Sequence, residues 1–247
     1  MAVLAYRAAT LTGSGALAAW LVGTLVLHGT GWEGGGVLAA FFVSSSLVSR
    51  GAPAAPGLDP KGDRRDYRQV LANGGVAAAG ALLGLRDPQL GVWLLTSALA
   101  AAAADTWATA FGARSAVPPR LILDGRPVPP GTSGGITLLG SAGGAAGALL
   151  VAATGAFAAG MPTLLPVAVL VGFGGMLLDS ALGAAAQGRF RCVECAEWSE
   201  WPVHRCGRPT THEGGLAWLD NDGVNLTAGA GAAIVAWGAW VWLCPCA

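Results

Sequence analysis

The chain has 247 residues, of which 53% are hydrophobic and 11% are charged, with 14 basic and 14 acidic side chains. Soluble domains carry about 25% charged residues, so this chain has too little charge to cover a water-exposed surface. The zero net charge argues against a nucleic-acid-binding protein, and 39 glycines among apolar residues favour closely packed membrane helices. The composition therefore predicts a membrane protein and excludes disordered, disulfide-scaffold and DNA-binding classes.

Seven uncharged stretches have roughly the length of a membrane helix, which needs about 20 mostly apolar residues. They are Ala8–Leu27, Gly34–Ser49, Val70–Leu85, Leu90–Phe111, Ser133–Ala156, Thr163–Gln187 and Val224–Leu243. The first is too long for a cleavable signal peptide, so we expect it to be a retained helix. The sequence predicts an all-α, polytopic integral membrane bundle of about seven transmembrane helices, with residues 1–247 as a single transmembrane domain.

Seven spans place alternate connections on opposite sides of a membrane. Thirteen of the 14 basic residues, all but Arg86, then fall on the side of the N-terminus. Since positive residues stay in the cytoplasm, we expect a cytoplasmic N-terminus and long cytoplasmic loops at 50–69, 112–132 and 188–223. We expect the protein in the inner membrane of a bacterium, with its active site facing the cytoplasm.

Two carboxylates, Asp105 and Asp179, lie within hydrophobic stretches. A charged side chain at the centre of a membrane helix costs about 2.5–3.5 kcal/mol on insertion scales, so such residues usually serve function. At a rise of about 1.5 Å per residue, Asp105 lies roughly 9 Å and Asp179 roughly 12 Å from the cytoplasmic ends of their spans. The alternative is a structural hydrogen bond to a neighbouring helix.

The segment before the third span offers cations for phosphate. Lys61, Arg64 and Arg65 precede the polar residues Gln69 and Asn73 at the membrane surface. Clusters of basic residues beside a membrane helix also occur as plain interfacial charge, which is the alternative interpretation.

Two further polar segments adjoin predicted spans. Pro130–Gly135 presents backbone N–H groups at an expected helix start, where an anion is favoured, although the pattern is not a P-loop. Asn221–Asn225 carries one carboxylate, Asp222, and two amides. Mg²⁺ accepts one or two carboxylates together with phosphate oxygens and water. Asp105, Asp179 and Asp222 would supply them if their helices are neighbours.

The loop 188–222 contains a cluster of metal ligands. Its candidate ligands are Cys192, Cys195 and Cys206 with His204 as the fourth, and His212 as the alternative fourth. A cytoplasmic loop is reducing, so disulfides are disfavoured, and three Cys with one His fit a closed tetrahedral Zn²⁺ site. We expect a structural zinc ion that folds this loop; unrelated thiols are the alternative.

Five ordered motifs together carry a family resemblance. They are Lys61-Gly-Asp-Arg-Arg-Asp66 continuing to Gln69-Val-Leu-Ala-Asn73, Ala104-Asp-Thr-Trp-Ala-Thr109, Pro130-Gly-Thr-Ser-Gly-Gly135, Asp179-Ser180 with Gly183-Ala184, and Asn221-Asp222 with Asn225. Over residues 50–225 the chain resembles the integral membrane family of plant phytyl-phosphate kinases in vitamin E synthesis and the animal transmembrane-protein-19 group. It is more weakly similar to CTP-dependent dolichol and phytol kinases. Ala110 stands where the first family usually has Glu.

The resemblance implies phosphoryl transfer from a nucleoside triphosphate, CTP or ATP, to a prenyl or phytyl monophosphate in the bilayer, with Mg²⁺ as cofactor. The matching positions imply catalytic Asp66, Asp105, Asp179 and Asp222, with the last three as magnesium ligands. Implied substrate- and nucleotide-binding residues are Lys61, Arg64, Arg65, Gln69, Asn73, Thr106, Gly131, Thr132, Ser133, Gly134, Ser180, Asn221 and Asn225. The alternatives are a CDP-lipid-forming cytidylyltransferase, a membrane transporter and a non-catalytic scaffold. Prenyl chain length, nucleotide and oligomeric state stay open.

Overall fold

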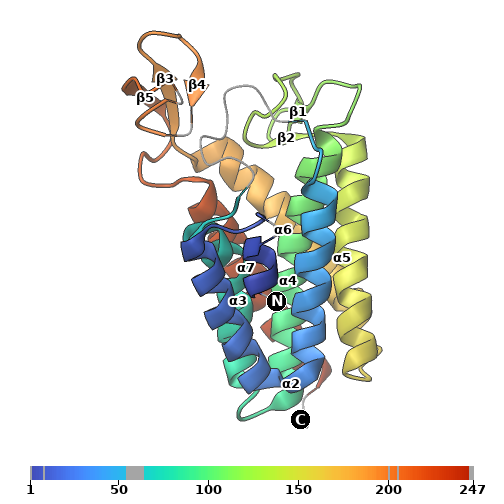
Figure 1. Cartoon of the computed structure of the whole chain (residues 1–247). Helices are drawn as coiled ribbons and strands as arrows, with labels where there is room; N and C mark the ends of the chain where they lie inside the picture. The colour runs from blue at the N-terminus through green and yellow to red at the C-terminus, as the bar shows by residue number, and fades with distance from the viewer. Residues whose placement is uncertain (1, 8, 54–63, 200, 205, 245–247) are drawn as a thin grey trace.

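The computed structural model describes residues 2–7, 9–53, 64–199, 201–204 and 206–244. Its helices are α1 (Ala2–Arg7), α2 (Gly13–Ser49), α3 (Tyr67–Leu83), α4 (Pro88–Gly112), α5 (Leu138–Ala158), α6 (Leu164–Ala186) and α7 (Asn221–Leu243). Strands β1 (Arg120–Leu121) and β2 (Gly135–Ile136) form one antiparallel sheet; β3 (Arg189–Cys192), β4 (Trp198–Ser199) and β5 (Thr210–Gly214) form a second, in the order β4-β3-β5 (Figure 1). The structure is mostly helical, as predicted. The short strands were not predicted, because segments of two to five residues carry too little periodicity to be recognised.

Helix α2 consists of two antiparallel arms that meet at Gly31, where φ is 61° and ψ is −150° (Figure 1). Glycine adopts this conformation readily, and other residues are strained in it. The first arm begins beside α3, because Gly15 packs against the backbone of Arg65. The second arm ends at the same end of the bundle, where the Arg114 side chain donates to the carbonyl of Arg50. The loop predicted between the first two spans is therefore reduced to a turn at Gly31.

Capping residues set the starts of four helices at positions that differ from the predictions. An N-cap side chain accepts a hydrogen bond from a backbone N–H two or three residues later. The caps are Thr12 before α2, Asp66 before α3, Thr137 before α5 and Asp220 before α7. Asp66 and Asp220 lie in the polar segments before the predicted starts at residues 70 and 224, whereas Thr12 and Thr137 lie inside the spans predicted to start at residues 8 and 133.

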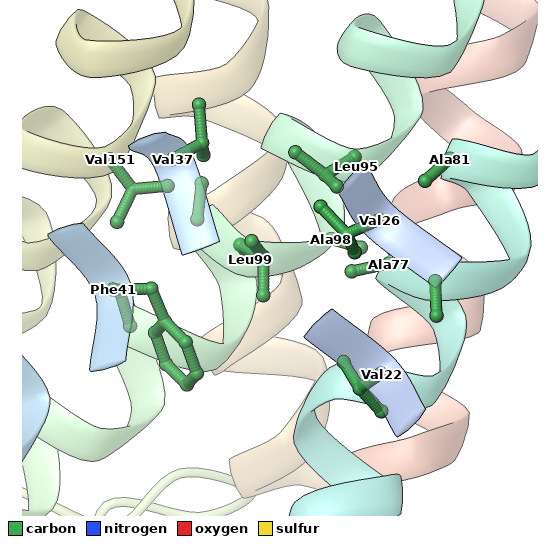
Figure 2. Close-up of a cluster of buried hydrophobic side chains, with 13 residues drawn as sticks. Val22, Val26, Val37, Phe41, Ala77, Ala81, Leu95, Ala98, Leu99 and Val151 are labelled. Atoms are coloured by element: carbon green, nitrogen blue, oxygen red, sulfur yellow. The ribbon is translucent and has the colours of Figure 1, made fainter. Parts of the chain in front are cut away.

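Helix α4 is the centre of the bundle. In the most apolar 18-residue stretch of α4, 72% is buried inside the protein, whereas the corresponding share for α7 is 22%. Figure 2 shows Leu95, Ala98 and Leu99 of α4 among side chains from both arms of α2, from α3 and from α5. Alanines of α4 face glycines of α5 and α6, as where Gly147 lies against the carbonyl of Ala103. Small residues at such contacts let membrane helices approach closely.

Four helices, α4, α5, α6 and α7, are long and apolar enough to cross a membrane. Large apolar side chains point away from the bundle on these helices. Phe157 on α5 is 91% exposed, and Ile234 on α7 is 69% exposed. Contiguous apolar surface of this kind is unfavourable in water and suits contact with lipid.

The long, charged connections lie at one end of the bundle, together with both sheets, and short turns lie at the other (Figure 1). The longest connection, between α6 and α7, returns to the point where it leaves. The N–H of Gly188 donates to the carbonyl of Leu219, and the N–H of Leu216 donates to that of Ala186, both at 2.9 Å. These hydrogen bonds hold the end of α6 beside the start of α7.

Replacing Gly172 by Ala is expected to lower the free energy of unfolding by about 1–3 kcal/mol, the usual cost of overpacking. An added Cβ would lie 2.8 Å from the Cβ and 2.9 Å from the carbonyl carbon of Ala100 on α4. Unfolding in detergent measures the change. Gly174→Ala is the matched control on the same helix, because its Cβ would meet nothing within 4 Å. Equal destabilisation by both variants would contradict this account of the α4–α6 contact.

Candidate functional site

Four polar side chains from four helices line one small cavity inside the bundle. They are Asn73 of α3, Asp105 of α4, Asp179 of α6 and Asn225 of α7. The remaining lining residues are alanines, glycines and one valine. The structure therefore brings together two of the predicted magnesium ligands and two of the predicted substrate-binding amides.

The cavity has the size and chemistry of a cation site. Its volume of about 10 Å³ is close to the roughly 10–15 Å³ needed for one water molecule. Within the described part of the chain, the buried Oδ1 atom of Asn225 has no hydrogen-bond partner. Carboxylates in apolar surroundings are costly unless a cation or hydrogen bonds compensate their charge. Two carboxylates and an amide oxygen are ligands that Mg²⁺ accepts.

Asn73 of the cavity wall and the predicted site residue Thr106 each donate a side-chain hydrogen bond to a backbone carbonyl of their own helix. The Nδ2 of Asn73 donates to the carbonyl of Gln69 at 2.9 Å, and the Oγ1 of Thr106 donates to the carbonyl of Ala102 at 2.9 Å. These hydrogen bonds leave the oxygen lone pairs of both side chains able to accept. They also fix the orientation of Asn73 at the cavity wall.

The start of α3 uses two predicted site residues as a capping box. The Oδ1 of Asp66 accepts from the N–H of Gln69 at 3.1 Å, and the Oε1 of Gln69 accepts from the N–H of Asp66 at 3.2 Å. This reciprocal pair stabilises a helix start. The structure thus gives Asp66 and Gln69 a folding role, and their catalytic and binding roles stay predictions.

Replacing Asp66 by Ala is expected to lower the free energy of unfolding by about 1 kcal/mol, since the cap of α3 is lost. Asp66→Asn is the control, because an amide oxygen still accepts from the N–H of Gln69 and restores most of the stability. Chemical denaturation measures both. The phosphoryl transfer that the family resemblance implies, measured in the Asn variant, then separates the two roles: retention would assign Asp66 to folding, whereas loss with normal stability would assign it to the reaction.

The predicted phosphate-binding cations differ in their surroundings. The Arg64 guanidinium donates to the carbonyl of Leu11 at 2.9 and 3.2 Å and lies over the ring of Tyr6. The Arg65 guanidinium makes no hydrogen bond or ion pair with any described residue, and burial lowers its pKa from the ordinary value; an arginine still stays charged. Among the described residues, Arg65 is therefore a partly buried cation with no side-chain partner, which suits it to bind an anion. Lys61 lies outside the described residues.

The glycine-rich segment is a turn, which corrects its predicted place at a helix start. Gly131 and Gly134 have φ of 86° and 78°, and α5 begins later. Gly134 packs against the carbonyl of Ser180 on α6, with no room for a side chain. The turn thus lies on the end of α6 that carries Asp179, so Gly134 and Ser180 meet as predicted site residues.

Side-chain hydrogen bonds hold this turn. The Ser133 Oγ donates to the Oε1 of Gln187 at 2.8 Å, and the Thr132 Oγ1 donates to the carbonyl of Pro129 at 2.8 Å. Gln187 is 2% exposed and is a site neighbour that the sequence analysis missed. In the sequence, the one feature that could have pointed to Gln187 is its position at the end of a predicted span.

Asp222 is not among the residues that line the cavity with Asp105 and Asp179, and its role as a third magnesium ligand stays a prediction. Its Oδ2 lies 3.8 Å from the Nε of Arg68, whose Nη2 forms a 2.6 Å ion pair with Asp220. Asp222 is 7% exposed, whereas Asn221 is exposed. Asp220 also caps α7. The helix that presents Asn225 to the cavity is thus fixed to α3 by a charge network that sequence analysis missed.

The cysteine loop brings together its four predicted ligands. The Sγ atoms of Cys192, Cys195 and Cys206 and a ring nitrogen of His204 lie within 4.8 Å of one another and can hold a metal ion. The Sγ atoms of Cys192 and Cys206 are 3.7 Å apart. A tetrahedral Zn²⁺ with Zn–S bonds of about 2.3 Å separates its sulfur ligands by roughly 3.8 Å, so the spacing fits zinc.

The surroundings of this cluster also suit a metal ion. The backbone N–H of Cys195 donates to the Cys192 Sγ at 3.4 Å and lowers the pKa of that thiol, which favours the thiolate. The Nδ1 of His204 lies 3.1 Å from the Cys206 Sγ, and its Nε2 lies 3.4 Å from a carboxylate oxygen of Glu197. A carboxylate behind a ligating His is common in metal sites. His212 instead packs against Phe190 on β3, outside the cluster.

Known proteins resemble this chain over most of its length. Residues 1–233 match the family described as integral membrane protein DUF92. Protein PGR of Arabidopsis thaliana is 31% identical over 260 residues, which cover 92% of this chain and 88% of that protein. An uncharacterized membrane protein of Methanocaldococcus jannaschii is 30% identical over 190 residues, which cover 74% of this chain and 78% of that protein. No solved structure matches.

Proposed function

Because the chain belongs to the DUF92 family of integral membrane proteins, we propose that it is a membrane kinase for lipid monophosphates. It transfers the terminal phosphoryl group of CTP or ATP to a prenyl or phytyl monophosphate. The bond between the β–γ bridging oxygen and the γ-phosphorus breaks, and a bond from an acceptor phosphate oxygen to that phosphorus forms. The products are the lipid diphosphate and a nucleoside diphosphate.

The observation that carries the proposal is the cavity shared by Asp105 and Asp179. Both carboxylates face one cation-sized space, and the Oδ1 of Asn225 has no other partner among described residues. Asp105, Asp179 and Asn225 would hold Mg²⁺ there, with Asp222 one turn above on α7. When bound, Mg²⁺ neutralises charge on the transferring phosphates. Two carboxylates already satisfy this ion, so the function does not depend on the Glu that Ala110 replaces.

The chain's own residues bind and orient the phosphates. Arg65 is a cation without a protein partner among the described residues, so it is suited to the charge that develops on the transferring group. The turn Gly131–Gly134 offers backbone N–H groups to phosphate oxygens. The acceptor is already an ionised phosphate oxygen, so the reaction needs positioning and charge neutralisation rather than a strong general base.

The proposed topology has seven spans, formed by the two arms of α2 and by α3 to α7. The α2 arms and α3 pack in the same bundle as the four long apolar helices. Basic residues gather at the end of the bundle with the long connections, which supports a cytoplasmic active site by the positive-inside rule. The protein would lie in the inner membrane of a bacterium, with a structural Zn²⁺ in its cytoplasmic loop.

A labelled-nucleotide assay tests the proposed reaction. Purified full-length protein is incubated with Mg²⁺, a prenyl or phytyl monophosphate, and CTP or ATP labelled at either the γ- or the α-phosphate. We expect γ-label in the lipid diphosphate and α-label only in nucleotide. Alpha-label in lipid would instead establish the cytidylyltransferase, and γ-label remaining wholly in nucleotide with every acceptor would refute the kinase.

A further inference from the structure

A second hollow lies between α6 and α7. It is lined by Leu170, Val171, Gly174 and Leu178 of α6 and by Gly231 and Val235 of α7, with Gly175 and Ala232 at its floor. Every one of these residues is apolar or lacks a side chain. Hereafter this hollow is called the α6–α7 groove.

Missing side chains create the groove. A Cβ at Gly174 would meet nothing within 4 Å, so this position opens directly onto the hollow. A Cβ at Gly231 would lie 2.9 Å from the Cδ2 of Leu178 across the groove. Leucine and valine side chains thus form walls around a floor of small residues, which gives a channel rather than a flat lipid-facing surface.

The groove adjoins the polar cavity. Gly175 lines both spaces. On α6 the residue after Leu178 is Asp179, and on α7 Gly231 lies three positions beyond Ala228 of the cavity wall. The groove runs from the carboxylates toward the starts of α6, away from the charged connections. The polar cavity, where a cation would bind, and the apolar groove, which extends toward the membrane interior, thus form two parts of one proposed site.

The size of the groove suits one hydrocarbon chain. Its volume is about 380 Å³, within the roughly 300–1,000 Å³ of small-molecule sites. From Leu170 to Leu178 it extends roughly 12 Å at 1.5 Å per residue. A groove of this length and volume has room for part of one methyl-branched chain.

We infer that the α6–α7 groove binds the phosphate-proximal part of a single prenyl or phytyl tail, while its phosphate lies at the polar cavity. This inference rests on the proposed kinase function and adds the place where the lipid substrate is recognised. The substrate reaches the groove laterally from the bilayer, because the groove opens on the lipid-facing side of α6 and α7.

Photo-crosslinking tests the groove independently of catalysis. Full-length protein in phosphatidylcholine nanodiscs is labelled with a phytyl monophosphate analogue that carries a diazirine near its phosphate. We expect label on residues 170–178 and 231–235, suppressed by unlabelled phytyl monophosphate and not by added phosphatidic acid. Gly174→Leu is expected to lower this labelling at least about tenfold, since its side chain fills the site. Gly238→Leu is the matched control on α7. Gly238 does not line the groove, and a Cβ added there would meet nothing within 4 Å.

The other outcomes overturn the inference in distinguishable ways. Saturable labelling of different helices would place the tail elsewhere and leave the kinase proposal standing. Labelling of the groove that phosphatidic acid suppresses equally would make it an ordinary lipid contact. An absence of saturable labelling together with no γ-phosphate transfer would refute the kinase as well. If Gly174→Leu does not fold, the labelled positions in the unmodified protein decide.

Discussion

Replacing Asp179 by Asn is expected to lower lipid-phosphate kinase activity about 100- to 1000-fold, the loss typical when one group that stabilises developing charge is removed. Asn keeps the shape of the side chain but removes the charge that, in the proposed mechanism, would hold Mg²⁺ beside Asp105 in the shared cavity. The bundle should remain folded, since a carboxylate in apolar surroundings costs stability rather than adding it. Transfer of γ-label, measured beside thermal unfolding, separates the two effects.

Thr96→Val is the matched control for this prediction. Thr96 is also buried on α4, and its Oγ1 has no hydrogen-bond partner among the described residues, but it faces Gly155 rather than the cavity. Its replacement should leave activity unchanged. Wild-type protein should also bind Mn²⁺ without nucleotide in a titration, and Asp179→Asn should not. Full activity of Asp179→Asn, or an equal loss in Thr96→Val, would remove the cavity from the mechanism.

Replacing His204 by Ala is expected to abolish zinc binding, whereas replacing His212 by Ala should leave one zinc ion per chain. His204 contributes a ring nitrogen to the cluster with Cys192, Cys195 and Cys206, and His212 packs elsewhere. Zinc in small structural sites contributes on the order of 10–16 kcal/mol of apparent binding free energy, and this energy folds the surrounding chain. Elemental analysis of protein purified without chelator measures the metal content directly.

The same variants should show that folding of the loop and stability of the helical bundle are independent. In His204→Ala, limited proteolysis is expected to cleave between residues 188 and 219, while the helices keep their unfolding temperature within a few degrees. Strong chelation of the wild-type protein should reproduce this pattern. Zinc-free wild-type protein with a protease-resistant loop, or zinc loss in His212→Ala alone, would show that the ligand set is wrong.

The sequence predicts the apolar helices and both intramembrane carboxylates because these depend on composition along one segment. Whether Asp222 joins Asp105 and Asp179 depends on how α7 is placed against α3, which no single segment encodes. The Arg68 pairs with Asp220 and Asp222 hold the start of α7 beside α3, and they join residues about 150 positions apart. A long-range contact of this kind is invisible to periodicity and spacing.

Some missed features were nevertheless encoded locally. Asp66 and Gln69 stand in the spacing of a capping box, which explains the start of α3 better than the apolar run does. The glycine at position 31 allows the reversal of α2, but several neighbouring glycines offer the same freedom, so packing of Gly29 against Ala81 selects the turn. The clustering of Cys192, Cys195, His204 and Cys206 was predictable because their short spacing leaves few alternatives.

The connection between α6 and α7 begins and ends at one place, where Gly188 and Leu219 are hydrogen-bonded to each other. A segment whose two ends meet can change in length or content without moving the helices on either side. The loop with the Cys/His cluster can therefore be described as a module between two helices of the bundle, and a short turn in its place would still connect them. Relatives that share the intramembrane carboxylates can differ in this module, because selection on the bundle and selection on the loop act separately.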